Sequence, residues 1–290
     1  MSTTDGQVLR YSAFTDAGEG GNPAGVVLDA RHLSDEQMLA IAAEVGYSET
    51  AFVCPRPAAD DGRAYDVKYF SAEAEVPFCG HATVAAGVAL AERDGPGDVV
   101  FTIGSGDIPV RTRREPDGFV TATLTSVAPE VHDISGQDVE HLLALLGWRA
   151  DELDPALPPK VSYAGARHGI LAAATRQRLA DLDYDYVGLK AYMLERDLTT
   201  VDLVWRADPL TFHARNPFPV GGVVEDPATG AAAAAFGAYL RAVGAVEPPA
   251  RVTILQGHDM GRPSRLLVDI DSERPEIHVT GNAVPVEAPG

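Results

Sequence analysis

Residues 79–87 read Cys-Gly-His-Ala-Thr-Val-Ala-Ala-Gly, and residues 225–233 read Glu-Asp-Pro-Ala-Thr-Gly-Ala-Ala-Ala. Both stretches contain Ala-Thr followed by small residues, and Ala82 and Ala228 are 146 positions apart, about half of the 290-residue chain. A helix built of small residues packs closely against neighbouring backbone, as expected for a helix enclosed by a sheet. The repeat therefore predicts two similar halves, each wrapped around a central helix.

Short strands and helices alternate around these two stretches, which predicts an α+β fold. Ser34 and Gln37 form a predicted capping box for a helix that ends at Gly46, and Ser135 is predicted to cap a helix that ends at Gly147. Further helices are predicted at 82–90, 186–194 and 228–243. Strands are predicted at 8–14, 24–28, 50–53, 63–70, 99–103, 108–113, 119–124, 161–163, 170–173, 201–205, 210–214, 251–255, 265–270 and 276–279. We expect two pseudo-symmetric halves, 1–127 and 128–290, each a curved, mostly antiparallel sheet around its helix, with a C-terminal tail that can pack back on the first half.

Composition limits the classes of function. Lys and Arg number 23 against 42 Asp and Glu, and the resulting net charge of −19 disfavours nucleic acids and anionic membranes as partners. The two cysteines, Cys54 and Cys79, are too few for a disulfide framework or a cysteine-based zinc or iron-sulfur site. The N-terminal residues have no apolar signal-peptide core, and no window approaches the ~18 apolar residues of a membrane span. These features predict a cytoplasmic protein in a reducing compartment.

The starts of the two small-residue helices are the first candidates for chemistry. A helix N-terminus offers unpaired N–H groups and the positive end of the helix dipole, which together bind carboxylate or phosphate. Cys79, Gly80 and His81 lie at one start, and Asp226 with Pro227 lies at the other. A purely structural role stays open for each of these residues. Asp before Pro is also a common helix cap, and a lone His or Cys is often a buried structural residue.

Glu49 places a carboxylate at the start of an otherwise apolar strand. It is either a solvated strand end or a general acid/base, because desolvation in a cleft moves the pKa of a carboxyl group toward the range that proton transfer at neutral pH requires. The glycines at 18–21 lack the spacing of a nucleotide-binding loop. Glu49 is therefore the first candidate for proton transfer.

Five segments, taken in order, resemble the phenazine-biosynthesis PhzF family. They are Gly21-Asn22-Pro23-Ala24-Gly25-Val26-Val27, Ser48-Glu49-Thr50-Ala51-Phe52, Cys79-Gly80-His81-Ala82-Thr83, Glu225-Asp226-Pro227-Ala228-Thr229-Gly230 and Gln256-Gly257-His258-Asp259-Met260-Gly261-Arg262-Pro263. The resemblance runs from about Tyr11 to the C-terminus. It implies the diaminopimelate epimerase fold, with two similar α+β halves and an active site between them.

The resemblance also implies an activity and a set of residues. PhzF isomerises a dihydro-hydroxyanthranilate: a glutamate removes a proton from one ring carbon, and protonation at another carbon shifts the double bonds. By motif that glutamate is Glu49, and His81, Asp226 and the backbone of Gly80 are implied to face the substrate. The implied chemistry needs no cofactor and no metal. A small carboxylate-bearing molecule is the implied substrate and a homodimer the implied assembly.

The remaining predicted site residues also come from the matched segments. Asn22, Thr229, Gly230, Ala231 and Gly257 are predicted to line the substrate site. Ala231 occupies a position where the family commonly has a small hydroxyl residue, which affects which substrate is held more than whether protons move. Two alternatives are kept: an epimerase that uses the single thiol of Cys79, and a binding or regulatory protein without turnover.

Overall fold

The computed structural model describes residues 7–56, 63–104 and 106–287. The chain divides into two units, Met1–Thr125 with Thr280–Gly290, and Ser126–Val279. The first unit contains β1 (Val8–Ala13), β2 (Asn22–Val27), α1 (Asp35–Val45), β3 (Glu49–Pro55), β4 (Ala64–Phe70), β5 (Glu75–Val76), α2 (Gly80–Asp94), β6 (Asp98–Ile103), β7 (Gly106–Arg114) and β8 (Val120–Thr125), and β17 (Ile277–Pro285) joins it from the C-terminal end.

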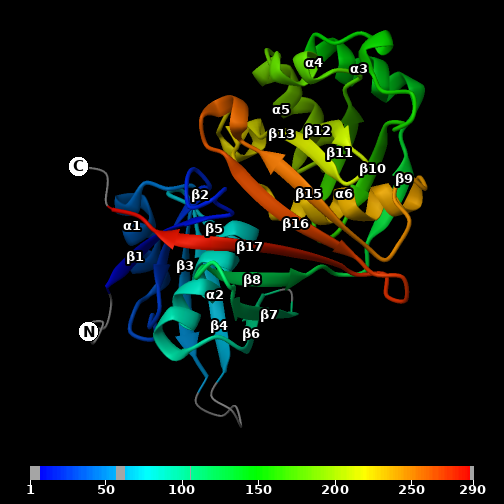
Figure 1. The fold of residues 1–290 in the computed structure, drawn as a ribbon. Helices are drawn as coiled ribbons and strands as arrows, with labels where there is room; N and C mark the ends of the chain where they lie inside the picture. The colour runs from blue at the N-terminus through cyan, green and yellow to red at the C-terminus, as the bar shows by residue number, and fades with distance from the viewer. Residues whose placement is uncertain (1–6, 57–62, 105, 288–290) are drawn as a thin grey trace. The chain divides into compact units, whose positions relative to one another are not determined.

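The first unit is a closed barrel around α2. Among the described residues, β1, β2, β3, β4, β6, β7, β8 and β17 pair in that order, and β17 pairs again with β1. Helix α2 packs against β1, β2, β3, β7 and β8 (Figure 1), and its residues 81–91 are all buried. Small residues are needed there, because a Cβ added at Gly87 would lie 3.0 Å from Val110 Cγ1. The small-residue stretch is therefore the central helix of this unit, as predicted.

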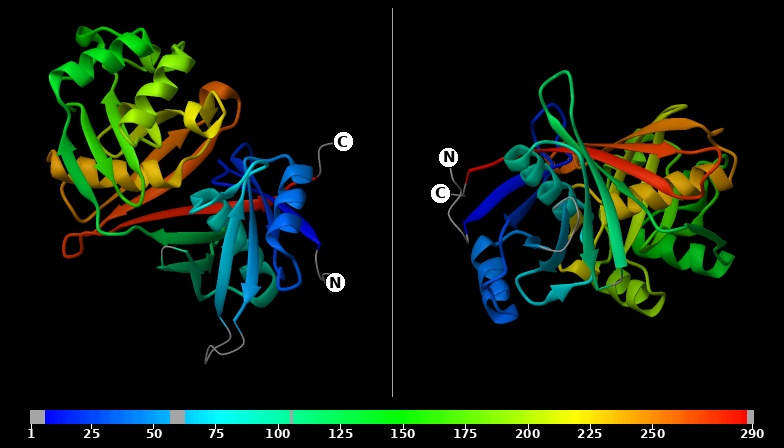
Figure 2. Two further views of the ribbon diagram at one scale, coloured as in Figure 1. Left: turned by 180° about the vertical axis from the view of Figure 1, so that it is seen from behind. Right: turned by 90° about the horizontal axis from the view of Figure 1, so that it is seen from below.

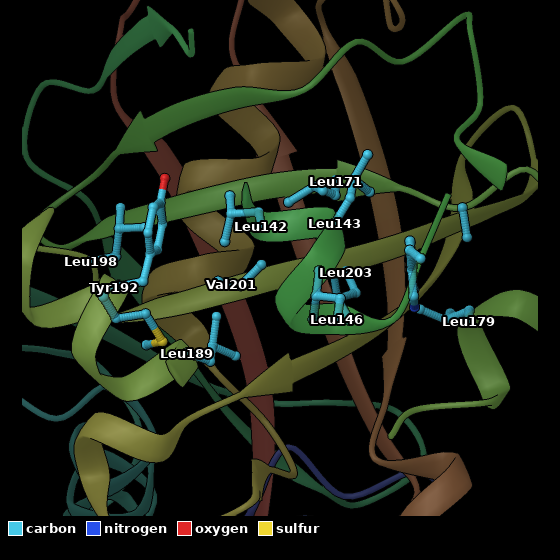
Figure 3. Packing of buried hydrophobic residues seen from close by; sticks show 13 residues of the cluster. Leu142, Leu143, Leu146, Leu171, Leu179, Leu189, Tyr192, Leu198, Val201 and Leu203 are labelled. Atoms are coloured by element: carbon cyan, nitrogen blue, oxygen red, sulfur yellow. The ribbon is translucent and has the colours of Figure 1, made fainter. Parts of the chain in front are cut away.

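The second unit is a sheet whose two faces are covered by helices. It contains β9 (Glu130–Asp133), α3 (Gly136–Leu146), η1 (Ala150–Glu152), β10 (Lys160–Tyr163), β11 (Arg167–Ala172), α4 (Arg176–Ala180), α5 (Tyr186–Glu195), β12 (Thr200–Asp208), β13 (Thr211–Pro217), η2 (Pro219–Gly221), β14 (Glu225–Asp226), α6 (Gly230–Ala242), β15 (Ala250–Gln256), η3 (His258–Met260) and β16 (Ser264–Ile270). Helix α6 packs against β9, β10, β11, β12 and β16, and Figure 2 shows it beside these strands in two further views. On the other face, leucines of α3 and residues of α5 pack against β11 and β12 (Figure 3).

The strand pairings follow the same succession in both units. From β1 to β7 they are antiparallel, parallel, antiparallel, parallel and antiparallel, and from β10 to β16 the same five follow in the same order. Each unit also places a short antiparallel ribbon, β4–β5 or β13–β14, just before its central helix. The mixed α+β content was predicted correctly, whereas a spatial two-fold relation stays a prediction.

Two predicted helices are confirmed to the residue, and the start of a third is wrong. Ser34 and Gln37 form the capping box of α1, which ends at Gly46 in the left-handed region, and Ser135 and Gly147 bound α3. Helix α6 begins at Gly230 rather than at position 228. The Ala-Thr pair consequently lies inside α2 but immediately before α6, so the repeat in sequence does not align the two helix starts.

The last strand is longer than predicted. The sequence predicts a closing strand over 276–279. In the structure β17 continues to Pro285, and a Cβ at Gly281 would meet the Phe14 ring at 2.1 Å. The glycine therefore admits an aromatic side chain of the barrel core rather than turning the chain. Among the described residues no helix has the length and apolar character that a membrane crossing requires.

Candidate functional site

Three elements of the first unit bring polar side chains together at the start of α2. Asn22 opens β2, Glu49 opens β3, and Cys79 and His81 flank the first residue of α2, Gly80. The parallel pairing of β2 with β3 sets Glu49 opposite Ala24. The predicted site residues Asn22, Glu49, Gly80 and His81 thus come together in the structure, and Cys79, which was not among them, lies in the same cluster.

The side chains of this cluster are within hydrogen-bonding distance of one another. The Glu49 carboxylate Oε2 lies 3.4 Å from His81 Nε2 and 3.5 Å from Cys79 Sγ. Asn22 Nδ2 lies 3.2 Å from His81 Nδ1, and Ser48 Oγ lies 3.4 Å from Nε2 of the same ring. The Glu49 side chain is 16% exposed and that of His81 7% exposed. The partly accessible Glu49 carboxylate therefore lies beside the buried His81 imidazole and the buried Cys79 thiol.

The start of α2 is held by a hydrogen-bonded chain that leaves its first N–H groups without a side-chain cap. Thr83 Oγ1 donates to the Cys79 carbonyl oxygen at 2.6 Å, so the Tyr69 hydroxyl, 2.6 Å away, must donate to Thr83. Burial raises the pKa of Tyr69, which keeps this donor protonated. The N-cap residues of α1, α3, α4 and α5 accept a hydrogen bond from the first turn, whereas those of α2 and α6 do not. The N-cap side chains of the two central helices therefore do not cap the first turn, in contrast to those of the four other helices.

In the second unit, Asp226 lies in a strand rather than at a helix cap. It belongs to β14 and pairs with Asn216 of β13, so the interpretation of Asp226 and Pro227 as the start of α6 is wrong. Gln256 Nε2 donates to Thr229 Oγ1 at 3.0 Å, and Thr229 Oγ1 donates to Asp226 Oδ2 at 2.6 Å. Because the Thr229 hydroxyl has a single proton, it accepts from Gln256 and donates to Asp226.

The other predicted residues of this unit surround the same turn. Gly230 and Ala231 are the first residues of α6, and Ala231 is half-buried. Gly257 has φ +73°, and a Cβ there would lie 2.3 Å from the Arg262 carbonyl oxygen and 2.8 Å from that of Pro227. Its role is thus steric, because only glycine allows the two backbone segments to approach so closely.

Gln256, which was not among the predicted site residues, stabilises the turn between Asp226 and Thr229 through hydrogen bonds. Besides its bond to Thr229 Oγ1, Nε2 donates to the Asp226 carbonyl at 2.8 Å, and Oε1 accepts from the Thr229 N–H at 3.1 Å. Its only signal in the sequence was its place in the Gln-Gly-His-Asp segment. Local sequence patterns do not identify such a residue, because its side chain bonds to backbone groups 27 to 30 positions away.

Gln256→Leu is expected to lower the free energy of unfolding by about 1–3 kcal/mol, because Leu leaves buried backbone groups without their partner. Urea denaturation followed by circular dichroism measures the change. Gln177→Leu, at an exposed position of α4, is the matched control and should stay within about 0.5 kcal/mol of the wild type. Equal losses in the two variants would contradict the role given to Gln256.

His168 belongs to a buried polar chain in the core of the second unit. Thr200 Oγ1 donates to Asn216 Oδ1 at 2.6 Å, so His168 must donate through Nδ1 to Thr200 at 2.7 Å. Asn216 Nδ2 donates to Asp202 Oδ1 at 3.0 Å. His168 is 0% and Asp202 2% exposed, which gives these residues a structural role.

Burial moves the pKa values of His168 and Asp202 in opposite directions. That of His168 is lowered to about 3, and that of Asp202 is raised to about 7 from an ordinary value of 3.8, with a smaller opposing effect of the Asn216 hydrogen bond. The folded state therefore holds a proton on Asp202 that the unfolded state releases as pH rises above 3.8. The contribution of Asp202 to stability is present at low pH and is lost as pH rises toward 7, whereas that of His168 is lost as pH falls below 6.5 toward 3.

Asp202→Asn, which mimics the protonated carboxyl group, is expected to change the pH dependence of stability. The free energy of unfolding of the variant relative to the wild type should increase between about pH 4 and pH 8, by at most about 4 kcal/mol at about 1.4 kcal/mol per pKa unit. Urea denaturation at several pH values measures this difference, with the exposed Asp183→Asn as control. A difference that does not vary with pH would contradict the assignment.

Within the described residues, one group of side chains offers donor atoms suited to a metal ion. Glu49, Cys79 and His81 each supply one donor, and these atoms lie within 4.8 Å of one another. The group coincides with the cluster at the start of α2. The same atoms could therefore serve either proton transfer or metal binding.

The chain is similar to known proteins over nearly its whole length. The family model described as "Phenazine biosynthesis-like protein" matches residues 11–288. The trans-2,3-dihydro-3-hydroxyanthranilate isomerase of Pseudomonas chlororaphis is 30% identical over 94% of both chains, and the uncharacterised isomerase YfhB of Bacillus subtilis is 28% identical over 97% of this chain and 96% of its own. The crystal structure of a PhzF-family protein of Bacillus anthracis matches with a TM-score of 0.84 and 28% identity, over 97% of this chain and 96% of its own. The chain thus belongs to the PhzC-PhzF family of phenazine biosynthesis-like proteins.

Proposed function

We propose that the protein is a cofactor-independent isomerase that moves a proton and a double bond on a small, unsaturated carboxylate. The observation that carries this proposal is the Glu49 carboxylate, which is partly accessible and lies 3.4 Å from the buried His81 imidazole. Relatives named as isomerases support the reaction class, and one of them acts on dihydro-hydroxyanthranilate according to its name.

In the proposed mechanism Glu49 takes a proton from an allylic carbon and returns it to another carbon, while the double bonds shift between them. Such proton transfer by a positioned carboxylate contributes about 10²–10⁴-fold to a rate. His81 orients the carboxylate, and the N–H groups at the start of α2 stabilise negative charge that develops on the substrate. One carboxyl group is sufficient, because it becomes protonated when it removes the first proton and can then protonate the other carbon. Glu49 is 16% exposed, so its carboxyl proton can exchange with solvent between the two steps.

The second unit is proposed to contribute Asp226 and the start of α6 to substrate binding. Thr229 donates to Asp226 Oδ2, and a carboxyl group offers several acceptor positions, so Asp226 can also accept a hydrogen bond from a hydroxyl or ammonium group of the substrate. Ala231 presents a methyl group where a hydroxyl is common in the family. We therefore propose an amino-acid-like or cyclic substrate that does not depend on a hydrogen bond at this position.

A second candidate is an epimerase that uses the Cys79 thiol, with Asp226 as the opposing base. The position of Cys79 directly before the first residue of α2 favours this candidate, because a thiol at a helix start can act in proton transfer. Cys79→Ser separates the two proposals, because the epimerase requires the thiol and the isomerase does not. An unchanged rate in this variant would remove the second candidate.

Proton NMR in deuterated buffer tests the proposed function directly. The protein is incubated with the dihydro-hydroxyanthranilate and with a panel of unsaturated cyclic amino acids. Deuterium at a substrate carbon, together with a shifted double bond, is the expected result. If no compound exchanges a carbon-bound proton, a binding or regulatory role is favoured over the isomerase.

A further inference from the structure

The hydrogen-bond partners of His81 differ in kind on the two sides of its ring. Glu49 Oε2 and Ser48 Oγ each lie 3.4 Å from Nε2, and the amide nitrogen Nδ2 of Asn22 lies 3.2 Å from Nδ1. An ionised carboxylate only accepts hydrogen bonds, whereas the NH₂ group of an amide only donates them. The His81 ring therefore meets an acceptor at Nε2 and a donor at Nδ1.

These partners match one of the three protonation forms of imidazole. In the neutral form with its proton on Nε2, the ring donates to Glu49 and accepts from Asn22. In the neutral form with its proton on Nδ1, a lone pair faces the carboxylate and two N–H groups face each other on the opposite side. The doubly protonated ring has the same conflict at Nδ1, and it places a positive charge in the first turn of α2, where the helix dipole disfavours a cation.

The Cys79 thiol does not decide between these forms. Its Sγ lies 3.3 Å from His81 Nδ1 and 3.5 Å from Glu49 Oε2, and a thiol is a weak donor with a weakly accepting sulfur. The single thiol proton can go to either neighbour. The stronger contacts, those of Glu49 and Asn22, therefore set the form of the ring.

Asn22 is held rigidly enough to impose this form. It opens β2, where it pairs with Ala13 of β1, and it is 2% exposed beside a His81 that is 6% exposed. Reversal of donor and acceptor within a buried pair leaves polar groups without partners, which is costly. The sequence placed Asn22 among the residues that line the substrate site, but so buried a side chain offers a substrate little surface.

We propose that Asn22 is a positioning residue that fixes His81 as the neutral tautomer with its proton on Nε2. Because Nε2 already carries a proton and Nδ1 accepts from Asn22, neither ring nitrogen is open to a proton from Glu49. When the substrate C–H bond breaks, its electron pair stays on the substrate and the proton stays on Glu49, which can deliver it to the second carbon or exchange it with solvent. This consequence rests on the proposed function, whereas the tautomer itself does not.

Nitrogen-15 NMR of the full-length protein, labelled in its histidine rings, tests the tautomer without a substrate. Protonated and unprotonated ring nitrogens differ clearly in chemical shift, and couplings to the carbon-bound ring protons distinguish Nδ1 from Nε2. The chain has eight histidines, and the signals lost in His81→Gln identify His81. We expect its proton on Nε2 at neutral pH. His168, which donates through Nδ1 to Thr200, is an internal reference of the opposite form.

Asn22→Asp replaces the donor at Nδ1 with a carboxylate acceptor of nearly the same shape, so a proton should appear on Nδ1 of His81. Asn282→Asp makes the same change elsewhere in the barrel, where the Asn282 side chain accepts from Thr15 Oγ1 at 3.0 Å, and it is the matched control that should keep the wild-type spectrum. A proton on Nδ1 of His81 in the wild-type protein would overturn the proposal. An unchanged His81 spectrum in folded Asn22→Asp would equally overturn it, because Glu49 alone would then set the tautomer.

The rate of substrate proton exchange separates this proposal from the proposed function. Asn22→Asp should lower the rate by about 10–100-fold, because a ring that carries a second proton makes Glu49 a weaker base, and Asn282→Asp should leave it unchanged. If the spectra are as expected while no compound exchanges a proton, the tautomer stands and the proposed isomerase fails. If exchange occurs while wild-type His81 carries its proton on Nδ1, the isomerase stands and the role of Asn22 fails.

Discussion

Replacement of Glu49 by Gln is expected to lower the rate of substrate proton exchange by about 10²–10⁴-fold, the usual contribution of a general acid/base. The amide has nearly the same shape as the carboxylate but cannot take up a proton from carbon. Gln carries no charge and the Glu49 side chain is 16% exposed, so the substitution introduces no buried charge and should leave the fold intact. The exchange rate in deuterated buffer, measured by proton NMR, and the thermal unfolding temperature separate loss of chemistry from loss of structure.

Glu44→Gln makes the same change in charge at an exposed position of α1 and is the matched control. Its exchange rate should equal that of the wild type. Retained exchange in Glu49→Gln would remove the carboxylate from the mechanism and leave the Cys79 thiol as the candidate base. Equal losses in both variants would point to a general effect of charge rather than to acid/base catalysis.

Local signals in the sequence were sufficient for most of the secondary structure. The caps of α1 and α3 were predicted because Ser at the start and Gly at the end of a helix act within one turn of the chain. The small residues of α2 and α6 predicted that a sheet encloses each helix, because neighbouring strands lie too close to the helix for larger side chains. Gly87 and Gly237 show this need, because a Cβ there would lie 3.0 Å and 2.6 Å from valine side chains.

The features that were missed depend on partners far along the chain. Strand β14 has two residues, and Asp before Pro is a good local signal for a helix start, but its pairing with Asn216 and Pro217 decides the conformation. The extension of β17 likewise depends on strand pairing with residues 11–13 at the other end of the chain. Neither pairing leaves a pattern within a window of ordinary length.

The sequence indicated only part of the cluster at the start of α2. Glu49 could be chosen because it is a polar residue at the start of an apolar strand, whereas His81 was included through the resemblance to the PhzF family. The contact of Glu49 with Cys79 could not be predicted, because a cysteine between Phe78 and Gly80 looks like any buried small side chain. The 3.5 Å distance from Cys79 Sγ to Glu49 Oε2 depends on the packing of β3 against α2, which brings together residues 30 positions apart.

The buried ion pair of Arg215 and Glu225 gives the second large expected effect. Arg215 Nε and Nη2 donate to the two carboxylate oxygens of Glu225 at 2.9 and 2.5 Å, and Nη1 donates to the Ala180 carbonyl oxygen at 2.7 Å. The side chains are 10% and 4% exposed. Glu225→Gln leaves a buried guanidinium without a counter-charge, so the free energy of unfolding should fall by about 3–5 kcal/mol.

Asp269→Asn provides a matched control, because Arg251 binds Asp269 through the same two nitrogens at 2.6 and 2.8 Å but the pair is exposed, at 60% and 31%. Water compensates the remaining charge there, so the expected loss is about 0–1 kcal/mol. The double variant Arg215→Met with Glu225→Leu should recover much of the stability lost in Glu225→Gln, because removing both charges also removes the cost of burying one alone. Urea denaturation compares the three proteins. Since Glu225 precedes Asp226 in β14, equal losses in Glu225→Gln and Asp269→Asn would mean that backbone pairing with β13, rather than the ion pair, holds Asp226 in place.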